Sequence, residues 1–263
     1  MKPPLPADSF FRAPRLGGAL KKEFYNSLSH IFRGPLMGAS GYVDYLFKGY
    51  AGPLTGEQLK QLARVRESIN RLAGVTDAFL DLAAFDLGLI QPARCSSDIR
   101  SMLEGMAADM APDIRHRGFS CREAGGRPLL AVDISIPSQP LYVSMDFHWL
   151  QTLLRELAAN VMLLAEDASS ITISARPRRS KTEIVISCSA SRLEDGNIRL
   201  FRPFYRLPER IYPQGGRRGG LGMSLVRRII GLHGGAVKTA RCGRTGFSVT
   251  VTLARARQPQ RGG

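Results

Sequence analysis

Apolar residues recur at intervals of three and four along the first fifth of the chain, and this spacing constrains the fold more than any other feature. Such spacing draws one apolar stripe down a helix, so we predict a long amphipathic helix over residues 18–48. Pro35 falls inside the pattern, although an interior proline removes a backbone hydrogen bond at a cost of about 3 kcal/mol. The stripe consists of Leu20, Phe24, Leu28, Phe32, Leu36, Ala39, Val43 and Leu46.

A second long helix is predicted after a break at residues 49–54. Thr55 and Gln58 have the spacing of a capping box, in which two side chains satisfy free amides of the first turn. The apolar stripe then continues to Leu87, and Gly88 with Pro92 ends the helix. Two helices joined by a short turn form an antiparallel hairpin.

The apolar stripes of one hairpin are too extensive for a single pair of helices to bury. A four-helix bundle made by two chains would bury them, so we predict a homodimer. The alternative is a monomer whose hairpin folds onto its own C-terminal domain.

The remainder of the chain alternates between helical and strand patterns, which predicts an α+β fold with a helix layer over a mixed sheet. Helices are expected over residues 97–113, 146–164 and 221–233, and strands over 129–136, 171–175, 183–189, 236–239 and 247–253. The predicted domains are an irregular arm at 1–17, the hairpin at 18–92, the α+β domain at 93–254 and a basic tail at 255–263.

Composition narrows the class of protein. With 263 residues, 44% hydrophobic and 22% charged, the chain suits a soluble globular protein. The net charge of +15 is spread along the chain, which makes nucleic acid an unlikely partner and favours acidic protein surfaces or phosphates. Four widely separated cysteines argue against a zinc site or disulfide framework. We find no pattern of a membrane span or signal peptide, so we expect a cytoplasmic protein without a transmembrane sensor.

His30 lies on the first predicted helix but away from its apolar stripe. At about 100° per residue it is roughly 200° from Leu28, so its imidazole should face solvent. An ordinary exposed histidine is the simplest interpretation of a lone residue of this kind.

The neighbours of His30 change that interpretation. Ser29, His30, Arg33, Pro35 and Leu36 resemble the phosphoacceptor box of sensor histidine kinases. The resemblance implies that His30 carries a phosphoryl group and that the partner is the receiver domain of a response regulator.

Within the same resemblance, the receiver would contact the helix surface below the histidine, including Phe32 and Arg33. Two positions depart from the family pattern: Ile31 replaces the acid after the histidine, and Gly34 replaces a threonine or asparagine. These are the positions that assist phosphorylation and hydrolysis in the family.

The second domain resembles the Bergerat-type ATPase domain of the same kinases, which implies an α/β sandwich. The sequence from Gly219 to Val226, followed by Leu232, His233, Gly234 and Gly235, is similar to the second glycine box of the family. The resemblance implies that Gly219, Gly220, Leu221 and Gly222 contact ATP. It also implies that Asn160 binds Mg²⁺, for which an amide oxygen is a suitable ligand, and that residues 201–206 form the hinge of the nucleotide lid.

Other positions of this domain depart from the family. Ala190 or Ser191 stands where the family has the aspartate that accepts a hydrogen bond from adenine, and no glycine pair follows. Glu156 and Leu163 replace an asparagine and a lysine that often flank the magnesium ligand. A lost buried polar contact costs about 1 to 3 kcal/mol, so ATP and Mg²⁺ binding is in doubt.

Three hypotheses for function remain open on the sequence. The chain is a divergent histidine kinase, or a histidine phosphotransfer protein that relays phosphoryl groups between His30 and receiver aspartates, or a pseudokinase that modulates a receiver or kinase without chemistry. A nucleic-acid-binding regulator is a distant fourth. We expect two-component signal transduction, with doubtful use of ATP.

Overall fold

In the computed structural model of the protein, the residues described are 17–116, 131–165, 169–189, 198–205, 218–243 and 245–258. They fall into two compact units, the first within Met1–Gln91 and Gly215–Leu221 and the second within Pro92–Gln214 and Gly222–Gly263. No helix among these residues combines the length and apolar character needed to cross a membrane.

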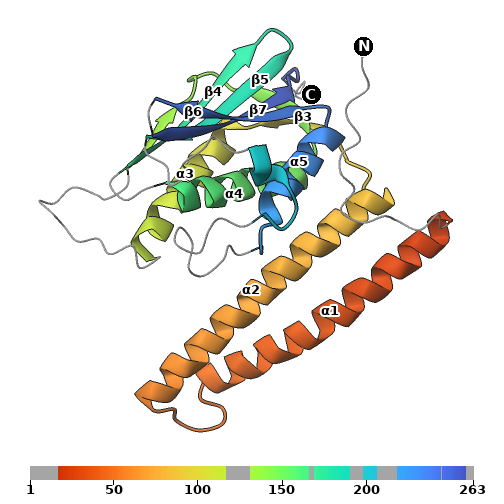
Figure 1. Ribbon diagram of the computed structural model, residues 1–263, viewed down its shortest axis with the longest axis vertical. Coiled ribbons are helices and arrows are strands. Elements are labelled where there is room, and N and C mark those ends of the chain that lie inside the picture. The colour runs from red at the N-terminus through yellow and green to blue at the C-terminus, as the bar shows by residue number, and fades with distance from the viewer. Residues whose placement is uncertain are drawn as a thin grey trace, which may run out of the picture. The chain divides into compact units, whose positions relative to one another are not determined.

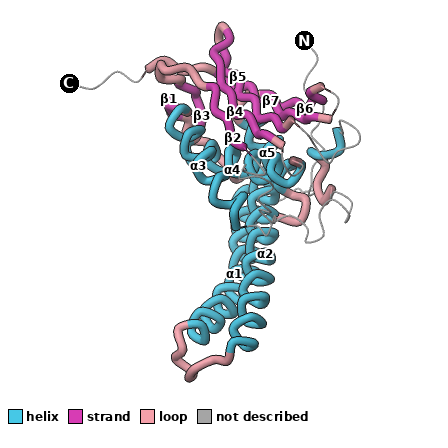
Figure 2. Tube along the Cα trace, turned by 90° about the vertical axis from the view of Figure 1, so that its left-hand side faces the viewer, coloured by secondary structure: helices cyan, strands magenta, loops and turns pink. Residues whose placement is uncertain are grey.

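The first unit contains the predicted helical hairpin. Helix α1 (Gly18–Phe47) continues through Pro35, and helix α2 (Gly56–Leu87) runs beside it (Figures 1 and 2). The Thr55 and Gln58 capping box is present, with the Thr55 amide donating to Gln58 Oε1 at 2.8 Å. Gly88 ends α2 in the left-handed conformation, at φ +71. The predicted helical hairpin is therefore confirmed.

Side chains from both helices hold the hairpin together. The rings of Phe32 and Phe79 meet edge to face with centroids 6.1 Å apart, and the Arg66 guanidinium lies 4.2 Å from the centroid of Phe47. These contacts bury little of α1, in which Val43 is the one buried residue among those described.

A large apolar surface of the hairpin is left exposed. Its large side chains retain between 39% and 75% of their accessible surface, and they are Leu20, Ile31, Phe32, Met37, Tyr42, Tyr45, Leu59, Val65 and Leu72. Exposed apolar residues occur singly on most proteins, whereas this set is spread along both helices of one hairpin.

The second unit has a five-stranded sheet in the order β2-β4-β5-β7-β6. Its strands are β2 (Ala131–Ser135), β4 (Ser170–Arg178), β5 (Lys181–Cys188), β6 (Ala236–Cys242) and β7 (Gly246–Ala254). Strand β2 pairs parallel to β4, and the other neighbours are antiparallel. The sheet is therefore mixed, as predicted.

Three helices cover one face of this sheet: α3 (Arg100–His116), α4 (Phe147–Leu164) and α5 (Gly222–Leu232) (Figure 1). The strands turn their apolar residues toward the helices, and the core they form includes Ile171, Ile173, Ile184, Ile186, Phe247, Val249 and Val251. The predicted fold class, a helical hairpin followed by an α/β sandwich, is confirmed.

Two short strands and a short helical turn were not predicted. Strands β1 (Cys95–Asp98) and β3 (Tyr142–Met145) pair antiparallel in a separate two-stranded sheet, and η1 (Ile198–Phe201) is a 3₁₀ helix. The predicted helix over 97–113 was placed too early, because β1 occupies its first residues and α3 begins at Arg100. Strands of four residues are too short to show a period.

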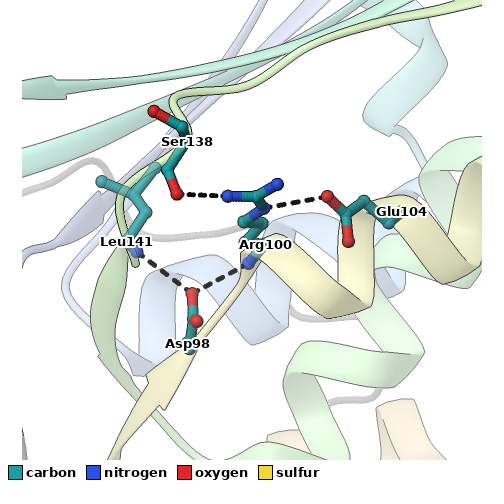
Figure 3. Close-up of polar contacts among 5 residues, drawn as sticks. All are labelled: Asp98, Arg100, Glu104, Ser138 and Leu141. Carbon is teal, nitrogen blue, oxygen red and sulfur yellow. Dashed lines mark hydrogen bonds and ion pairs between the residues drawn. The ribbon is translucent and has the colours of Figure 1, made fainter.

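Asp98 joins β1, α3 and the segment before β3 (Figure 3). Its Oδ1 atom accepts hydrogen bonds from the Arg100 amide at 3.1 Å and the Leu141 amide at 3.0 Å. The Arg100 guanidinium in turn donates to Glu104 Oε1 at 2.9 Å and to the Ser138 carbonyl. One carboxylate therefore satisfies amides from two segments that lie far apart in the sequence.

Replacing Asp98 with alanine should lower the free energy of unfolding by about 1 to 3 kcal/mol, because two amides lose their acceptor. Asp133→Ala removes an exposed acid from β2 and should change it by less than about 0.5 kcal/mol. Urea unfolding of both variants measures the difference. Equal effects of the two substitutions would contradict the role of Asp98.

Candidate functional site

His30 lies on the exposed surface of α1. One turn further, Arg33 reaches α2, where its Nε and Nη2 atoms lie 3.2 and 3.1 Å from Asp77 Oδ1. Both partners of this ion pair are about half exposed. The pair fixes the Arg33 side chain near the histidine but leaves part of the guanidinium open to solvent.

The residues that follow His30 offer it no acid or amide. Ile31 is 64% exposed, and no atom lies within 4 Å of the position that a Cβ would take at Gly34. Phe32 remains 41% exposed despite its contact with Phe79. After His30 the helix therefore presents two exposed apolar side chains, Ile31 and Phe32, and the partly exposed charge of Arg33.

Asp77 is a residue that sequence reasoning missed. It lies between Thr76 and Ala78 on α2, both of which are buried. A charge next to buried positions was the available signal, but the register of the hairpin was needed to identify Arg33 as its partner.

In the second unit, Asn160 lies on α4, which Asp146 caps through the amides of His148 and Trp149. The Asn160 side chain is partly exposed, and its Nδ2 atom donates to the Glu156 carbonyl at 2.7 Å. Because the nitrogen is engaged, the amide oxygen is the atom available to a cation. No group of three or more His, Cys, Asp or Glu side chains gathers as a metal site within the described ranges.

Gly222 begins α5 in close contact with α4. A methyl group at this position would overlap Glu156 Oε2 and would lie 3.1 Å from Asn160 Nδ2. Glu156 itself is only 6% exposed. A side chain at the first residue of α5 would therefore require the ends of these two polar side chains to shift.

The structure brings together two residues of the predicted nucleotide set, Asn160 and Gly222. Asn160 and Gly222 are neighbours in the second unit, whereas Gly219, Gly220 and Leu221 belong to the first unit. Gly219 and Gly220 have φ values of +57 and +84, which glycine adopts without strain. Sequence reasoning noted Glu156 only as a departure from the family, and its position against Gly222 was missed.

The residues of the predicted lid hinge are described as far as Tyr205, after which 206–217 lie outside the described part of the chain. Phe204 is exposed at 58% and has φ +60, a conformation that costs energy for a residue with a side chain. Ala190 and Ser191, which replace the adenine-binding aspartate of the family, also lie outside the described residues.

The run from Leu232 to Gly235 has a structural purpose. The buried His233 ring donates from Nδ1 to the Ile229 carbonyl at 2.7 Å, and its Nε2 accepts from the Asp146 amide at 3.2 Å. Gly234 has φ +70, and a Cβ at Gly235 would lie 2.6 Å from the Thr252 carbonyl oxygen. The run thus ties the end of α5 to the start of α4.

The contact at Gly222 predicts a destabilising effect of one methyl group. Gly222→Ala should lower the free energy of unfolding by about 1 kcal/mol, because the buried carboxylate of Glu156 must shift to admit the new atom. Gly231→Ala, later in the same helix, adds a methyl group in open space and should stabilise by up to about 1 kcal/mol. Thermal or urea unfolding distinguishes them, and a harmless Gly222→Ala would contradict the described contact.

His233 predicts a loss of stability in acid. Burial lowers the pKa of its imidazole below the ordinary value, and the nearby Arg94 charge adds to the shift. The unfolded chain, with a histidine pKa of about 6.5, then binds the extra proton more readily than the folded chain. The contribution of neutral His233 to the free energy of unfolding is complete above the unfolded-state pKa of about 6.5. It should decline as the pH falls from there toward the lower pKa of the folded state.

Urea unfolding at a series of pH values tests this expectation. His233→Gln should reduce the dependence of stability on pH between about 5 and 7. His148→Gln removes an exposed histidine from α4 and should leave it unchanged. The same pH profile in the His233 variant and the native chain would refute the assignment.

Two family models match the chain in order. The histidine kinase A phospho-acceptor domain matches residues 20–88, and the histidine kinase-, DNA gyrase B- and HSP90-like ATPase matches residues 145–257. The second match implies an ATP-binding type of domain.

Curated relatives include three bacterial proteins. The "Non-motile and phage-resistance protein" of Caulobacter vibrioides is 26% identical, with 89% of this chain and 27% of the relative covered. Histidine protein kinase DivJ of the same species is 24% identical, with 89% of this chain and 37% of DivJ covered. Signal transduction histidine-protein kinase BaeS of Escherichia coli is 25% identical, with 92% and 48% covered. The chain thus spans less than half the length of each of these relatives.

Solved structures show the same fold. Full-length ShkA in complex with AMPPNP has a TM-score of 0.70 at 23% identity, and the match covers 91% of this chain and 47% of the ShkA chain. The histidine kinase AdeS of Acinetobacter baumannii has a TM-score of 0.57 at 16% identity, with 87% and 98% covered. With a phospho-acceptor hairpin and an ATPase-type domain in this order, the chain belongs to the histidine kinase family of two-component signalling proteins.

Proposed function

We propose that the chain relays phosphoryl groups between His30 and the aspartate of a response-regulator receiver domain. The observation that carries this proposal is the exposed position of His30 on α1, with Arg33 held one turn away by Asp77. The proposed hairpin domain, residues 18–92, performs the transfer, and the ATPase-like domain, residues 93–254, is degenerate. We place the reaction in the cytoplasm, where receiver domains are available.

The proposed step exchanges one bond for another. A ring nitrogen of His30 attacks the phosphorus of the aspartyl phosphate, an N–P bond forms, and the O–P bond to the aspartate breaks. The imidazole releases its N–H proton to solvent, and transfer to a second receiver reverses these changes. The exposed ring permits such an approach, and the partly open guanidinium of Arg33 can attract the anionic receiver site.

ATP is a poor candidate for the source of the phosphoryl group. Ile31 cannot accept a proton from the imidazole, as the acid at this position does in the family. Gly34 bears on a different reaction, because it cannot position the water that would hydrolyse the aspartyl phosphate of a receiver. Any Mg²⁺ needed in the relay would be supplied with the acidic site of the receiver. In a chain that does bind ATP, Asn160 with Gly219, Gly220, Leu221 and Gly222 would be the contacts, by family resemblance.

The proposed partners are a receiver domain and a second copy of this chain. The receiver would contact α1 below His30, where Phe32 and Arg33 remain partly exposed. The second copy would cover the exposed apolar residues of the hairpin in a four-helix bundle. The net charge of +15 favours encounter with acidic surfaces.

Two other functions stay open. A divergent histidine kinase is favoured by the match to the ATPase family over residues 145–257. A pseudokinase modulator is favoured by the loss of the functional side chains at Ile31 and Gly34, and it gives His30 no chemistry.

Mixing the chain with a receiver domain phosphorylated on its aspartate tests the proposal. The native chain should become labelled, and His30→Ala should lose at least about 99% of the label, because no other ring nitrogen occupies that site. His148→Ala, which removes an exposed histidine from α4, should be labelled like the native chain. Equal labelling of the His30 variant would exclude the relay through this residue.

A further inference from the structure

The hairpin of β4 and β5 extends past most of the sheet to which it belongs. Strand β2 pairs with β4 only as far as Ser174, and β6 pairs with β7 no further than Thr252. Strand β7 alone continues beside the hairpin, with Ala254 opposite Lys181. The turn at residues 179–180 therefore projects beyond the neighbouring strands (Figures 1 and 2).

Cations gather at the end of this hairpin. The amide of Arg255, the residue after β7, donates to the Ser180 carbonyl at 2.9 Å, which holds a fifth basic residue against the turn. All five are exposed, and they form a set that we call the basic tip: Arg176, Arg178, Arg179, Lys181 and Arg255.

Glu183 is the only acid among the described residues of β4, β5 and β7. Its Oε1 atom accepts a hydrogen bond from Arg176 Nε at 2.9 Å, and its Oε2 atom lies 3.6 Å from Arg178 Nε. The hydrogen bond from Arg176 holds the pKa of Glu183 below its ordinary value, so this carboxylate is charged at neutral pH. It offsets one of five cations, and Arg179, Lys181 and Arg255 make no ion pair with any residue that the structure describes.

Arg179 occupies the turn at an energetic cost. Its φ value is +38, and Phe204 is the only other described residue besides glycine with positive φ. A two-residue turn between strands favours asparagine or glycine, which adopt positive φ more readily than arginine does. A strained conformation kept at an exposed arginine points to a use for its side chain.

The chemistry of the basic tip fits a surface dense in phosphate groups, which guanidinium groups bind through paired hydrogen bonds. Protein partners are mostly held by buried aromatic and aliphatic side chains, and single-stranded nucleic acids by aromatic rings that stack on bases. None of the large exposed apolar side chains of the described residues lies on β4, β5 or β7. A projecting tip also reaches a flat surface before the rest of the sheet does.

We propose that the basic tip docks the second unit on a membrane surface that contains anionic phospholipids. Negative headgroups attract each nearby lysine or arginine, with a gain of about fivefold in membrane binding per residue. Charge alone holds this contact, so binding should weaken as the salt concentration rises. The proposal is independent of the relay, because His30 belongs to the first unit.

Flotation of the full chain with lipid vesicles tests the proposal. At about 0.1 M salt the chain should bind vesicles of phosphatidylcholine and phosphatidylserine in a ratio of about 2 to 1, and should not bind phosphatidylcholine alone. Arg179→Gln combined with Lys181→Gln should weaken binding at least about tenfold. Arg155→Gln combined with Arg227→Gln removes the same charge from exposed positions of α4 and α5, and should bind like the native chain.

A single substitution separates the use of Arg179 from its role in the turn. Arg179→Asn should raise the midpoint of thermal unfolding, because asparagine tolerates positive φ better. The same variant should bind the anionic vesicles about fivefold more weakly, because it lacks one cation. Unchanged binding would contradict the use inferred for the arginine side chain.

The proposal is overturned if the native chain binds both kinds of vesicle equally or neither, or if the two double variants bind alike. It is also overturned if the tip substitutions abolish binding to a DNA duplex and leave vesicle binding unchanged, since the basic tip would then contact nucleic acid. Circular dichroism checks that the variants fold, and Arg179→Asn decides the outcome if the double variant does not.

Discussion

The second unit depends on the contact between α4 and α5, which is polar at both ends and apolar between them. Gly222 meets Glu156 at one end, and His233 accepts a hydrogen bond from the Asp146 amide at the other. The start of α5 thus lies near the later part of α4 and its end near the start of α4, so the two helices run antiparallel. At one end, the space beside Glu156 favours a residue without a side chain at position 222. At the other end, the buried imidazole of His233 favours its neutral form.

This contact gives a physical meaning to a motif that was recognised by resemblance. The run from Leu232 to Gly235 looked like part of a nucleotide box, but His233 and Gly235 serve the packing of α5 against α4 and β7. These contacts give the motif a role in the fold of the second unit that does not depend on a nucleotide.

Much of the fold could be predicted from periodicity and end signals. The hairpin was predicted with its capping box because thirty-residue patterns and local caps need no information from elsewhere in the chain. The strands β1 and β3 could not be predicted, because each gains its partner only through a distant segment. For the same reason, the pairing of Arg33 with Asp77 and the position of Glu156 against Gly222 required the structure.

The phosphoryl group on His30 is proposed to come from the aspartate of a receiver domain and not from ATP. Incubation of the purified chain with γ-labelled ATP and Mg²⁺, beside incubation with a labelled receiver domain, compares the two sources directly. The account predicts acid-labile label on the His30 peptide from the receiver and none from ATP. Label on that peptide from ATP, at a rate similar to transfer from the receiver, would contradict it.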